Sequence, residues 1–272
     1  MNANLKSTVN CKQSNVDALK LLLVQHDVVV GDIDANLHKI DSLLNSCTQK
    51  ADIIILTEMF STGFSMKPEL FAEPINGKAV TWLCNKAKTL DTAITAGVMI
   101  DDNGKYYNRA FFVYPDGTYD YYDKRHLFSY GGEDKKFTAG KSLLLIKYLG
   151  WKICPLVCYD LRFPVWSRNV YNYDLLIYMS SWPAARQKVW SVLPVARAME
   201  NQCYVAAVNR IGSDKTGNYS GESKVVNQFG ETIAQSIPSV ECLTFCEISL
   251  SKLHAERAEF PFLNDADAFC LN

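Results

Sequence analysis

The sequence has no apolar run of membrane-spanning length and no excess of charge of either sign, its formal net charge being −1 at pH 7. A spanning helix needs about 20 consecutive apolar residues, and binding to nucleic acid or an anionic membrane favours a strongly basic surface. We therefore expect neither a membrane nor a nucleic-acid partner. Residues 1–20 are polar and lack the apolar stretch of a signal peptide. They are expected to form a loose N-terminal extension of a cytoplasmic protein.

Patterns of cysteine and histidine that are typical of metal sites are also missing. The nine cysteines are an odd number and form no C-x-x-C pair. The four histidines form no ligand-like cluster. Free thiols in a reducing compartment are the simpler interpretation of this cysteine usage. We expect neither a metal nor a cofactor.

The composition fits one globular domain, because 272 residues with 48% hydrophobic and 21% charged side chains can bury a large core. We assign residues 21–272 to this domain. Helical spacing at 33–47, 80–90 and 187–201 alternates with strand-like runs at 21–30, 53–56, 93–100, 109–114, 151–157, 174–179, 203–209, 224–227, 232–235 and 243–249. This alternation predicts an α/β fold. Pro194 should kink or split the last helix.

Cys158 ends the apolar run at 151–157 (WKICPLV) and is followed by a segment that contains Pro164. This order predicts a buried strand that delivers a thiol to a sharp turn, with the proline placed where a helix could begin. Unpaired backbone N–H groups at such a turn can favour a thiolate and later hold an oxyanion. A lone cysteine is more often an inert part of the core. A nucleophile would need a base and a cation from elsewhere in the chain.

Two further segments supply these groups. Glu58 follows a short run rich in isoleucine at 51–56 (ADIIIL), so its carboxylate should lie at the C-terminal edge of a strand. Lys124 lies among aromatic residues, just before a glycine-containing loop (GGED). Taken singly, each of these residues is more often a solvated surface charge. Together with Cys158, in the order Glu, Lys, Cys, they indicate an acyl-transfer site.

The three segments also carry a resemblance. TEMFSTGF around Glu58, YDKRHLF around Lys124 and VCYDLRFP around Cys158 resemble the signatures of the nitrilase, or carbon–nitrogen hydrolase, superfamily. The similarity continues through YMSSWPAAR, ARAMENQCYVAAVNRIG and GESKVVNQFGE, and covers nearly the whole chain from about residue 21. The residues around the lysine and the cysteine are most similar to the bacterial omega-amidase branch, which hydrolyses the terminal amide of 2-oxo acid amides such as 2-oxoglutaramate.

The resemblance implies a fold and a mechanism. The fold is a four-layer α-β-β-α sandwich that dimerises to extend the layers, so we expect a homodimer or a larger homo-oligomer. Cys158 would attack a small-molecule amide, Glu58 would act as general base, and a thioester would form. Lys124 and the backbone N–H of Tyr159 would stabilise the oxyanion. Glu133 matches a second glutamate of the family that positions the substrate or the lysine, although a solvated loop acid is the alternative.

Substrate recognition needs a further set of residues. A 2-oxo acid amide carries a carboxylate at its far end, which requires a cation or hydrogen-bond donors. Arg186 and Arg210 each follow a predicted strand, where an α/β site would open, although either could be a surface arginine. Arg162 is expected to make a structural ion pair, for instance with Asp160 or Glu200. Apolar walls are expected from four residues, with core packing as the alternative for each: Phe64, Tyr130, Phe163 and Trp182.

Other functions stay open from the sequence. An N-carbamoyl-amide hydrolase and a nitrile hydrolase would use the same Glu, Lys and Cys on the same scaffold. A noncatalytic binding protein on this fold would need none of the three, and their joint presence disfavours it.

Overall fold

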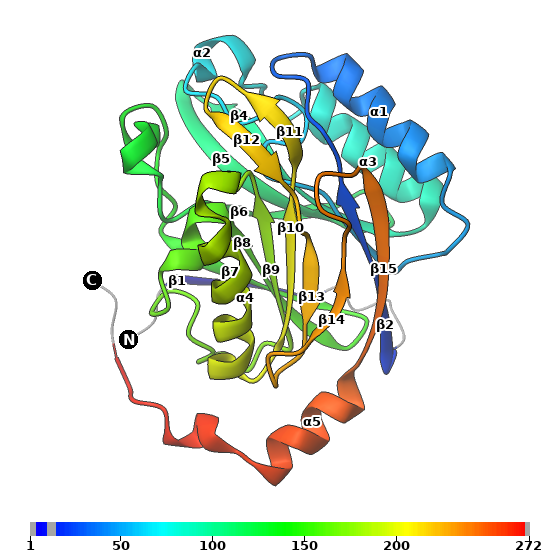
Figure 1. The fold of residues 1–272 in the computed structure, drawn as a ribbon, viewed down its shortest axis with the longest axis vertical. Coiled ribbons are helices and arrows are strands. Elements are labelled where there is room, and N and C mark those ends of the chain that lie inside the picture. Colours follow the sequence, from blue (N-terminus) through cyan, green and yellow to red (C-terminus); the bar gives the residue numbers. More distant parts are fainter. Residues whose placement is uncertain (1–3, 10–14, 270–272) are drawn as a thin grey trace.

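Two stacked β-sheets lie between outer layers of helices in the computed structural model, which describes residues 4–9 and 15–269 (Figure 1). Helices α1 and α3 cover one sheet, and α4 covers the other. This arrangement confirms the expected four-layer α-β-β-α sandwich. It also explains the nearly continuous apolar strands of the sequence, because each sheet is covered on both faces.

The first sheet has six strands in the order β15-β2-β3-β4-β5-β6. Its strands are β2 (Ala18–Gln25), β3 (Ile53–Ile55), β4 (Ala93–Asp102), β5 (Lys105–Val113), β6 (Tyr119–Asp123) and β15 (Cys242–Ser249). Helices α1 (Ile33–Asn45) and α3 (Lys78–Leu90) pack their apolar faces against β2 to β5. The Asp32 side chain begins α1 by accepting a hydrogen bond from Ala35 N at 2.9 Å.

The second sheet has seven strands in the order β1-β7-β8-β9-β10-β13-β14. Its strands are β1 (Asn4–Val9), β7 (Ser142–Tyr148), β8 (Trp151–Val157), β9 (Leu175–Ser180), β10 (Tyr204–Asn209), β13 (Lys224–Val226) and β14 (Thr232–Gln235). Helix α4 (Gln187–Asn201) packs against β10 and β13. The remaining elements are α2 (Pro68–Phe71), α5 (Leu250–Glu259), the hairpin β11 (Ile211–Asp214) with β12 (Gly217–Ser220), and short 3₁₀ turns.

The strand directions place chemistry at one end of the sandwich. Strands β2, β3 and β4 are parallel in one sheet, and β8, β9 and β10 are parallel in the other. Glu58 follows β3, Cys158 directly follows β8 and Ser181 directly follows β9. The carboxyl ends of parallel strands are the usual place for a site in an α/β fold.

Several details differ from the expectations. Helix α4 runs from Gln187 to Asn201 with Pro194 inside it, so Pro194 does not split the helix. Packing against β10 and β13 outweighs the loss of one backbone hydrogen bond. No helix begins at Pro164, which follows a 3₁₀ turn, η3 (Cys158–Arg162). Strands β6 and β7 and helix α5 were not expected.

The N-terminal residues also differ from the expectation of a loose extension. Residues Asn4–Val9 form β1, which pairs in parallel with β7, and β2 begins at Ala18. Residues 1–3 and 10–14 lie outside the described part. Backbone pairing at the open edge of β7 does not require apolar side chains, which is why a polar segment can form a strand there.

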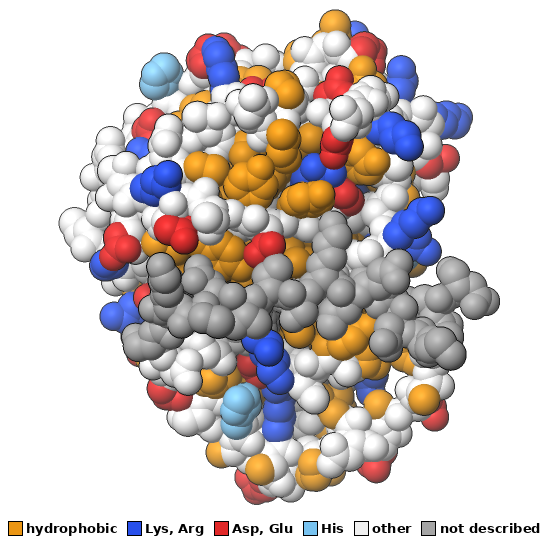
Figure 2. All heavy atoms as spheres, turned by 180° about the vertical axis from the view of Figure 1, so that it is seen from behind, with side chains coloured by type: hydrophobic (Ala, Val, Ile, Leu, Met, Phe, Trp, Pro, Cys, Tyr) orange, Lys and Arg blue, Asp and Glu red, His pale blue; other side chains and the backbone are white. Residues whose placement is uncertain are grey.

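The charges are mixed over the surface that Figure 2 shows, with basic and acidic side chains interspersed. This distribution matches the formal net charge of −1. In the described ranges, no helix combines the length and the apolar composition needed to cross a membrane.

The packing between the layers gives a stability prediction. Leu156 of β8 is fully buried in the main hydrophobic core, whereas Leu70 of α2 is 65% exposed. We expect Leu156→Ala to lower the free energy of unfolding by about 2–5 kcal/mol, because it leaves a cavity. The matched variant Leu70→Ala should change it by less than about 0.5 kcal/mol. Denaturant unfolding measures both values, and equal effects would contradict this assignment of the core.

Candidate active site

Glu58 lies in a tight turn after β3, held against the neighbouring strand β4. Phe60 N donates to Gly97 O at 3.0 Å, and Gly97 N donates to Thr57 O at 3.1 Å. A Cβ atom on Gly97 would come within 2.9 Å of Glu58 Cα, so only glycine permits this approach. Met59, the next residue, has a φ of 47°. This left-handed conformation turns the chain sharply and places the fully buried Glu58 carboxylate inside the molecule.

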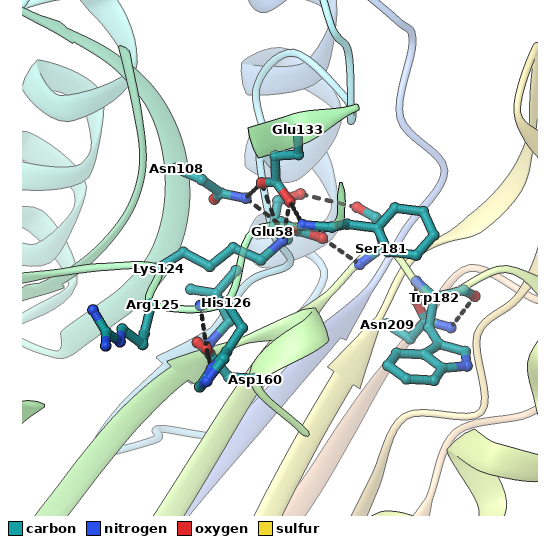
Figure 3. A network of polar contacts seen from close by, with 12 residues as sticks. Glu58, Asn108, Lys124, Arg125, His126, Glu133, Asp160, Ser181, Trp182 and Asn209 are labelled. Carbon is teal, nitrogen blue, oxygen red and sulfur yellow. Dashed lines mark hydrogen bonds and ion pairs between the residues drawn. The ribbon is translucent and has the colours of Figure 1, made fainter. Parts of the chain in front are cut away.

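A buried ion cluster forms around Lys124, which directly follows β6 (Figure 3). Lys124 Nζ donates to Glu58 Oε1 at 2.8 Å and to Glu133 Oε2 at 2.9 Å. All three side chains are 0% exposed. Glu133, in a 3₁₀ turn (Glu133–Lys135), also accepts from Phe128 N at 2.6 Å. The structure therefore brings both predicted glutamates onto the predicted lysine.

Electrostatics keep the ammonium charged. Burial alone lowers the pKa of Lys124, but the neighbouring Glu133 and Glu58 carboxylates outweigh burial and raise that pKa above its ordinary value. Burial raises the pKa of Glu133, and the Lys124 ammonium opposes this rise. Lys124 is thus a fixed positive charge in a site sheltered from water.

Two polar residues of the cluster were not assigned a role from the sequence. Asn108 Nδ2 donates to Glu58 Oε1 at 2.7 Å and to Glu133 Oε1 at 2.9 Å. Ser181 N donates to Glu58 Oε2 at 3.0 Å. The available signal was an asparagine inside the strand segment YYNRAFFV, a position where asparagine is disfavoured. Ser181 contributes a backbone group, for which no side-chain pattern exists.

Cys158 has a φ of 42°, in the left-handed region that disfavours side chains. Burial raises its pKa well above the ordinary value, and the negative charge of Glu58 adds to this rise. Lys124 and the Ser181 backbone N–H oppose it. The resting group is therefore a thiol beside a carboxylate, and not the thiolate that an open helix N-terminus would favour.

A second network holds the turn after Cys158. Asp160 is fully buried and accepts from Val157 N at 3.1 Å, His126 N at 3.0 Å and Tyr122 Oη at 2.8 Å. Its carboxylate is also 2.8 Å from His126 Nδ1. These contacts join the cysteine turn to the Lys124 segment and fix the two relative to each other.

The three predicted catalytic residues line one cavity of about 930 Å³. Glu58, Lys124, Cys158 and Tyr159 lie in its wall, and so do four of the predicted substrate-binding residues, Phe64, Tyr130, Trp182 and Arg186. Arg186 lies over the Phe128 ring, 5.0 Å from its centroid. Tyr130 is 89% exposed at the mouth, whereas Trp182 is buried.

Two predicted substrate-binding residues lie elsewhere. Phe163 stacks on His126 with ring centroids 3.7 Å apart and is not among the residues that line the cavity. Arg210 is fully buried and donates to Asp214 at 3.0 Å and to Asp27 at 3.2 Å. The expectation that Arg210 meets the substrate is therefore wrong, because two carboxylates already occupy its guanidinium. Asp27 and Asp214 line the cavity, so Arg210 joins two parts of its wall.

Arg162 also lies elsewhere than expected, because it lines the cavity. It was expected in an ion pair with Asp160 or Glu200, but Glu200 pairs with Arg197 at 2.9 Å. Arg162 lines the cavity and lies over the Trp182 ring, 5.2 Å from its centroid. Two arginines, Arg162 and Arg186, thus reach the cavity that contains Cys158.

In the part of the chain described, no group of three or more His, Cys, Asp or Glu side chains could hold a metal.

Comparison with known proteins matches this geometry. The carbon–nitrogen hydrolase family model matches residues 20–258. An omega-amidase YafV of Yersinia enterocolitica is 44% identical, over 94% of this chain and 100% of that protein. A 2-oxoglutaramate amidase of Bacillus subtilis is 30% identical, over 89% of this chain and 95% of that protein.

A solved structure agrees at the level of the fold. XC1258 from Xanthomonas campestris, described as a CN-hydrolase superfamily protein, superposes with a TM-score of 0.91 at 38% identity. The match covers 94% of this chain and 100% of that one. The resemblance read from the three segments is thereby confirmed. The chain belongs to the carbon–nitrogen hydrolase family and is a hydrolase of carbon–nitrogen bonds.

Proposed function

We propose that the protein is a cysteine-dependent omega-amidase that releases ammonia from the terminal carboxamide of a small 2-oxo dicarboxylic acid amide, such as 2-oxoglutaramate or 2-oxosuccinamate. The observation that carries the proposal is the cavity in which Glu58, Lys124 and Cys158 meet two arginines. The similarity to the Yersinia omega-amidase and the Bacillus 2-oxoglutaramate amidase supports the substrate class.

The first step is proton transfer from the thiol. A carboxylate offers about four lone-pair positions, and three on Glu58 are occupied by Lys124, Asn108 and the Ser181 N–H. The remaining position is on Oε2, where it can accept the Cys158 proton. Cys158 attacks the amide carbonyl carbon in the same step as its proton moves to Glu58, so that the thiolate forms only as it reacts. A thiol with a raised pKa suits this route, because a free thiolate is never needed.

The attack moves negative charge onto the carbonyl oxygen. Lys124 Nζ and the backbone N–H of Tyr159 stabilise that oxyanion, and one such donor is typically worth about 3 kcal/mol. Glu58 then passes its proton to the departing ammonia and a thioester remains. Glu58 takes a proton from water, which attacks the thioester, and the thiol is restored as the 2-oxo acid leaves. Glu133 holds Lys124 in position throughout.

Substrate choice follows from charge at the far end of the amide. Arg162 and Arg186 are the cavity arginines that can meet a carboxylate, and a guanidinium can bind one through two parallel hydrogen bonds. Phe64 and Trp182 form apolar walls around the carbon chain. The seven cysteines in the described ranges are free thiols, which fits the reducing cytoplasm proposed for this enzyme.

Replacing the nucleophile tests the mechanism. We expect Cys158→Ala to lower kcat for ammonia release from 2-oxoglutaramate by at least about a thousandfold, because no other group can form the thioester. The matched control is Cys154→Ala, which removes a buried thiol of β8, the strand that precedes Cys158, and should keep activity. Ammonia release is measured for amides, carbamoyl amino acids and nitriles in parallel. Unchanged activity in Cys158→Ala would refute the mechanism, and a preference for nitriles or carbamoyl compounds would refute the substrate class.

Replacing the arginines tests the substrate. We expect Arg162→Met or Arg186→Met to lower kcat/KM for 2-oxoglutaramate about ten- to a hundredfold, because hydrogen bonds to the substrate carboxylate are lost. The same variants should lower kcat/KM for an uncharged amide of similar length by less than about threefold. Arg168→Met is the control, since Arg168 donates to Glu200 O and does not line the cavity. Equal losses for both substrates would show that neither arginine recognises the carboxylate.

We also propose that the protein assembles as a homodimer or larger homo-oligomer. Val192 and Met199 of α4 are 53% and 49% exposed, and Phe229, beside the Gly230 that packs on Met199, is 57% exposed. A partner chain would bury these apolar side chains together. Light scattering should give at least twice the 30.6 kDa chain mass. The double variant Met199→Lys, Phe229→Lys should weaken assembly if this face is the interface. A monomer of the unaltered protein at micromolar concentration would contradict the proposal.

A further inference from the structure

The catalytic cluster has an unbalanced charge. Two carboxylates, Glu58 and Glu133, share the single ammonium of Lys124, and all three side chains are fully buried. Burial raises the pKa of Glu133 and the negative charge of Glu58 adds to this rise, while the Lys124 ammonium opposes it. A protonated Glu58 could not accept the proton of Cys158. Some further group must stabilise both carboxylates without adding charge.

Asn108 supplies that group. Its side-chain amide has two N–H donors, and Nδ2 contacts one carboxylate oxygen of each glutamate, at 2.7 and 2.9 Å. Its backbone carbonyl accepts from Lys124 N at 2.9 Å. Asn108 is 1% exposed and lies within β5, where pairing with Met99 of β4 and the bond from Lys124 N hold its backbone. Figure 3 shows its amide directed at the two carboxylates.

The carbonyl oxygen of the Asn108 side chain indicates that the site requires the two N–H donors of this amide. Asn108 Oδ1 is buried and has no hydrogen-bond partner among the described residues. Leaving a buried acceptor unsatisfied typically costs about 1–3 kcal/mol. The opposite orientation of the amide would set its oxygen against two carboxylates and lose both donated bonds. The site thus tolerates one unsatisfied acceptor and keeps two donors.

We propose that Asn108 is a positioning residue of the catalytic cluster, whose amide holds Glu58 and Glu133 on either side of Lys124 so that Glu58 acts as the base through Oε2 alone. Lys124 and Asn108 together occupy both lone-pair positions of Glu58 Oε1. Ser181 N occupies one position of Oε2. The proton is therefore exchanged at a single place beside Cys158. This inference rests on the proposed function, because it assigns how the proposed base is held.

The test is the pH dependence of three variants at position 108. Asn108→Leu keeps the approximate shape and removes both donors, Asn108→Ser keeps one hydroxyl donor, and Asn108→Asp adds a third carboxylate. With fewer donors, the carboxylates of the cluster hold a proton to higher pH, so the acidic limb of kcat/KM moves upward. We expect a shift of about one pH unit in Asn108→Leu, a smaller one in Asn108→Ser and a larger one in Asn108→Asp. The loss of activity at low pH should appear in kcat, with KM nearly unchanged.

The control separates positioning from folding. Asn169 is another buried, hydrogen-bonded asparagine, whose Nδ2 donates to Tyr173 O at 3.0 Å and Asn201 O at 2.9 Å. Asn169→Leu should lower the thermal unfolding midpoint and leave the acidic limb in place. The groups that titrate around Asn108 are Glu58, Lys124 and Glu133, with Cys158 next to Glu58. An unchanged acidic limb in both Asn108→Leu and Asn108→Ser would overturn the proposal.

A second readout needs no substrate. The rate of alkylation of Cys158 by iodoacetamide, followed by mass spectrometry of the peptide, also depends on an unprotonated base beside the thiol. The acidic limb of this alkylation rate should shift least in Asn108→Ser, more in Asn108→Leu and most in Asn108→Asp. If the unaltered protein releases no ammonia from any amide yet the alkylation limb shifts, the proposed function fails and the role of Asn108 stands. If ammonia is released and neither limb shifts, the role of Asn108 fails alone.

Discussion

The buried contact of one ammonium with two carboxylates is the constraint on which this structure depends. Charges removed from water are tolerated only when their partners and hydrogen bonds are in place. Lys124 follows β6, Glu58 follows β3 and Glu133 belongs to a 3₁₀ turn, while Asn108 and Ser181 contribute from β5 and the end of β9. Four of these residues come from the six-stranded sheet and its loops, and Ser181 comes from the other sheet. The cluster is therefore complete only when the two sheets have packed together.

Local strain accompanies this constraint. Met59 and Cys158, which follow β3 and β8, both have positive φ values, at 47° and 42°. Such conformations cost on the order of 1–3 kcal/mol each and persist only where the surroundings determine them. Gly97 permits the close approach at the first turn, and Asp160 ties the second to the Lys124 segment. The strain directs a carboxylate and a thiol into the same cavity.

Side-chain direction after a strand was the main thing that sequence reasoning could not supply. Arg210 and Arg186 both follow predicted strands, yet Arg210 turns inward to two aspartates whereas Arg186 reaches the cavity. Arg162 was assigned to an ion pair and instead lines the cavity. No sequence motif indicated Asn108, because its proposed role depends on contacts with two carboxylates, Glu58 and Glu133, that are distant in the sequence. The number of layers came from the family resemblance, and the apolar strands agree with it because they need cover on both faces.

Sequence alone was enough for the α/β class, the positions of most strands and helices, and the family, because these depend on local hydrophobic spacing and on short segments around Glu58, Lys124 and Cys158. It also determined which reactive groups are available. The packed fold was needed to show that these groups line one cavity, and that Arg162 and Arg186 line it whereas Arg210 does not. The reason is physical: hydrogen bonds and ion pairs act over about 3 Å, and the packing of the two sheets determines which distant residues come that close.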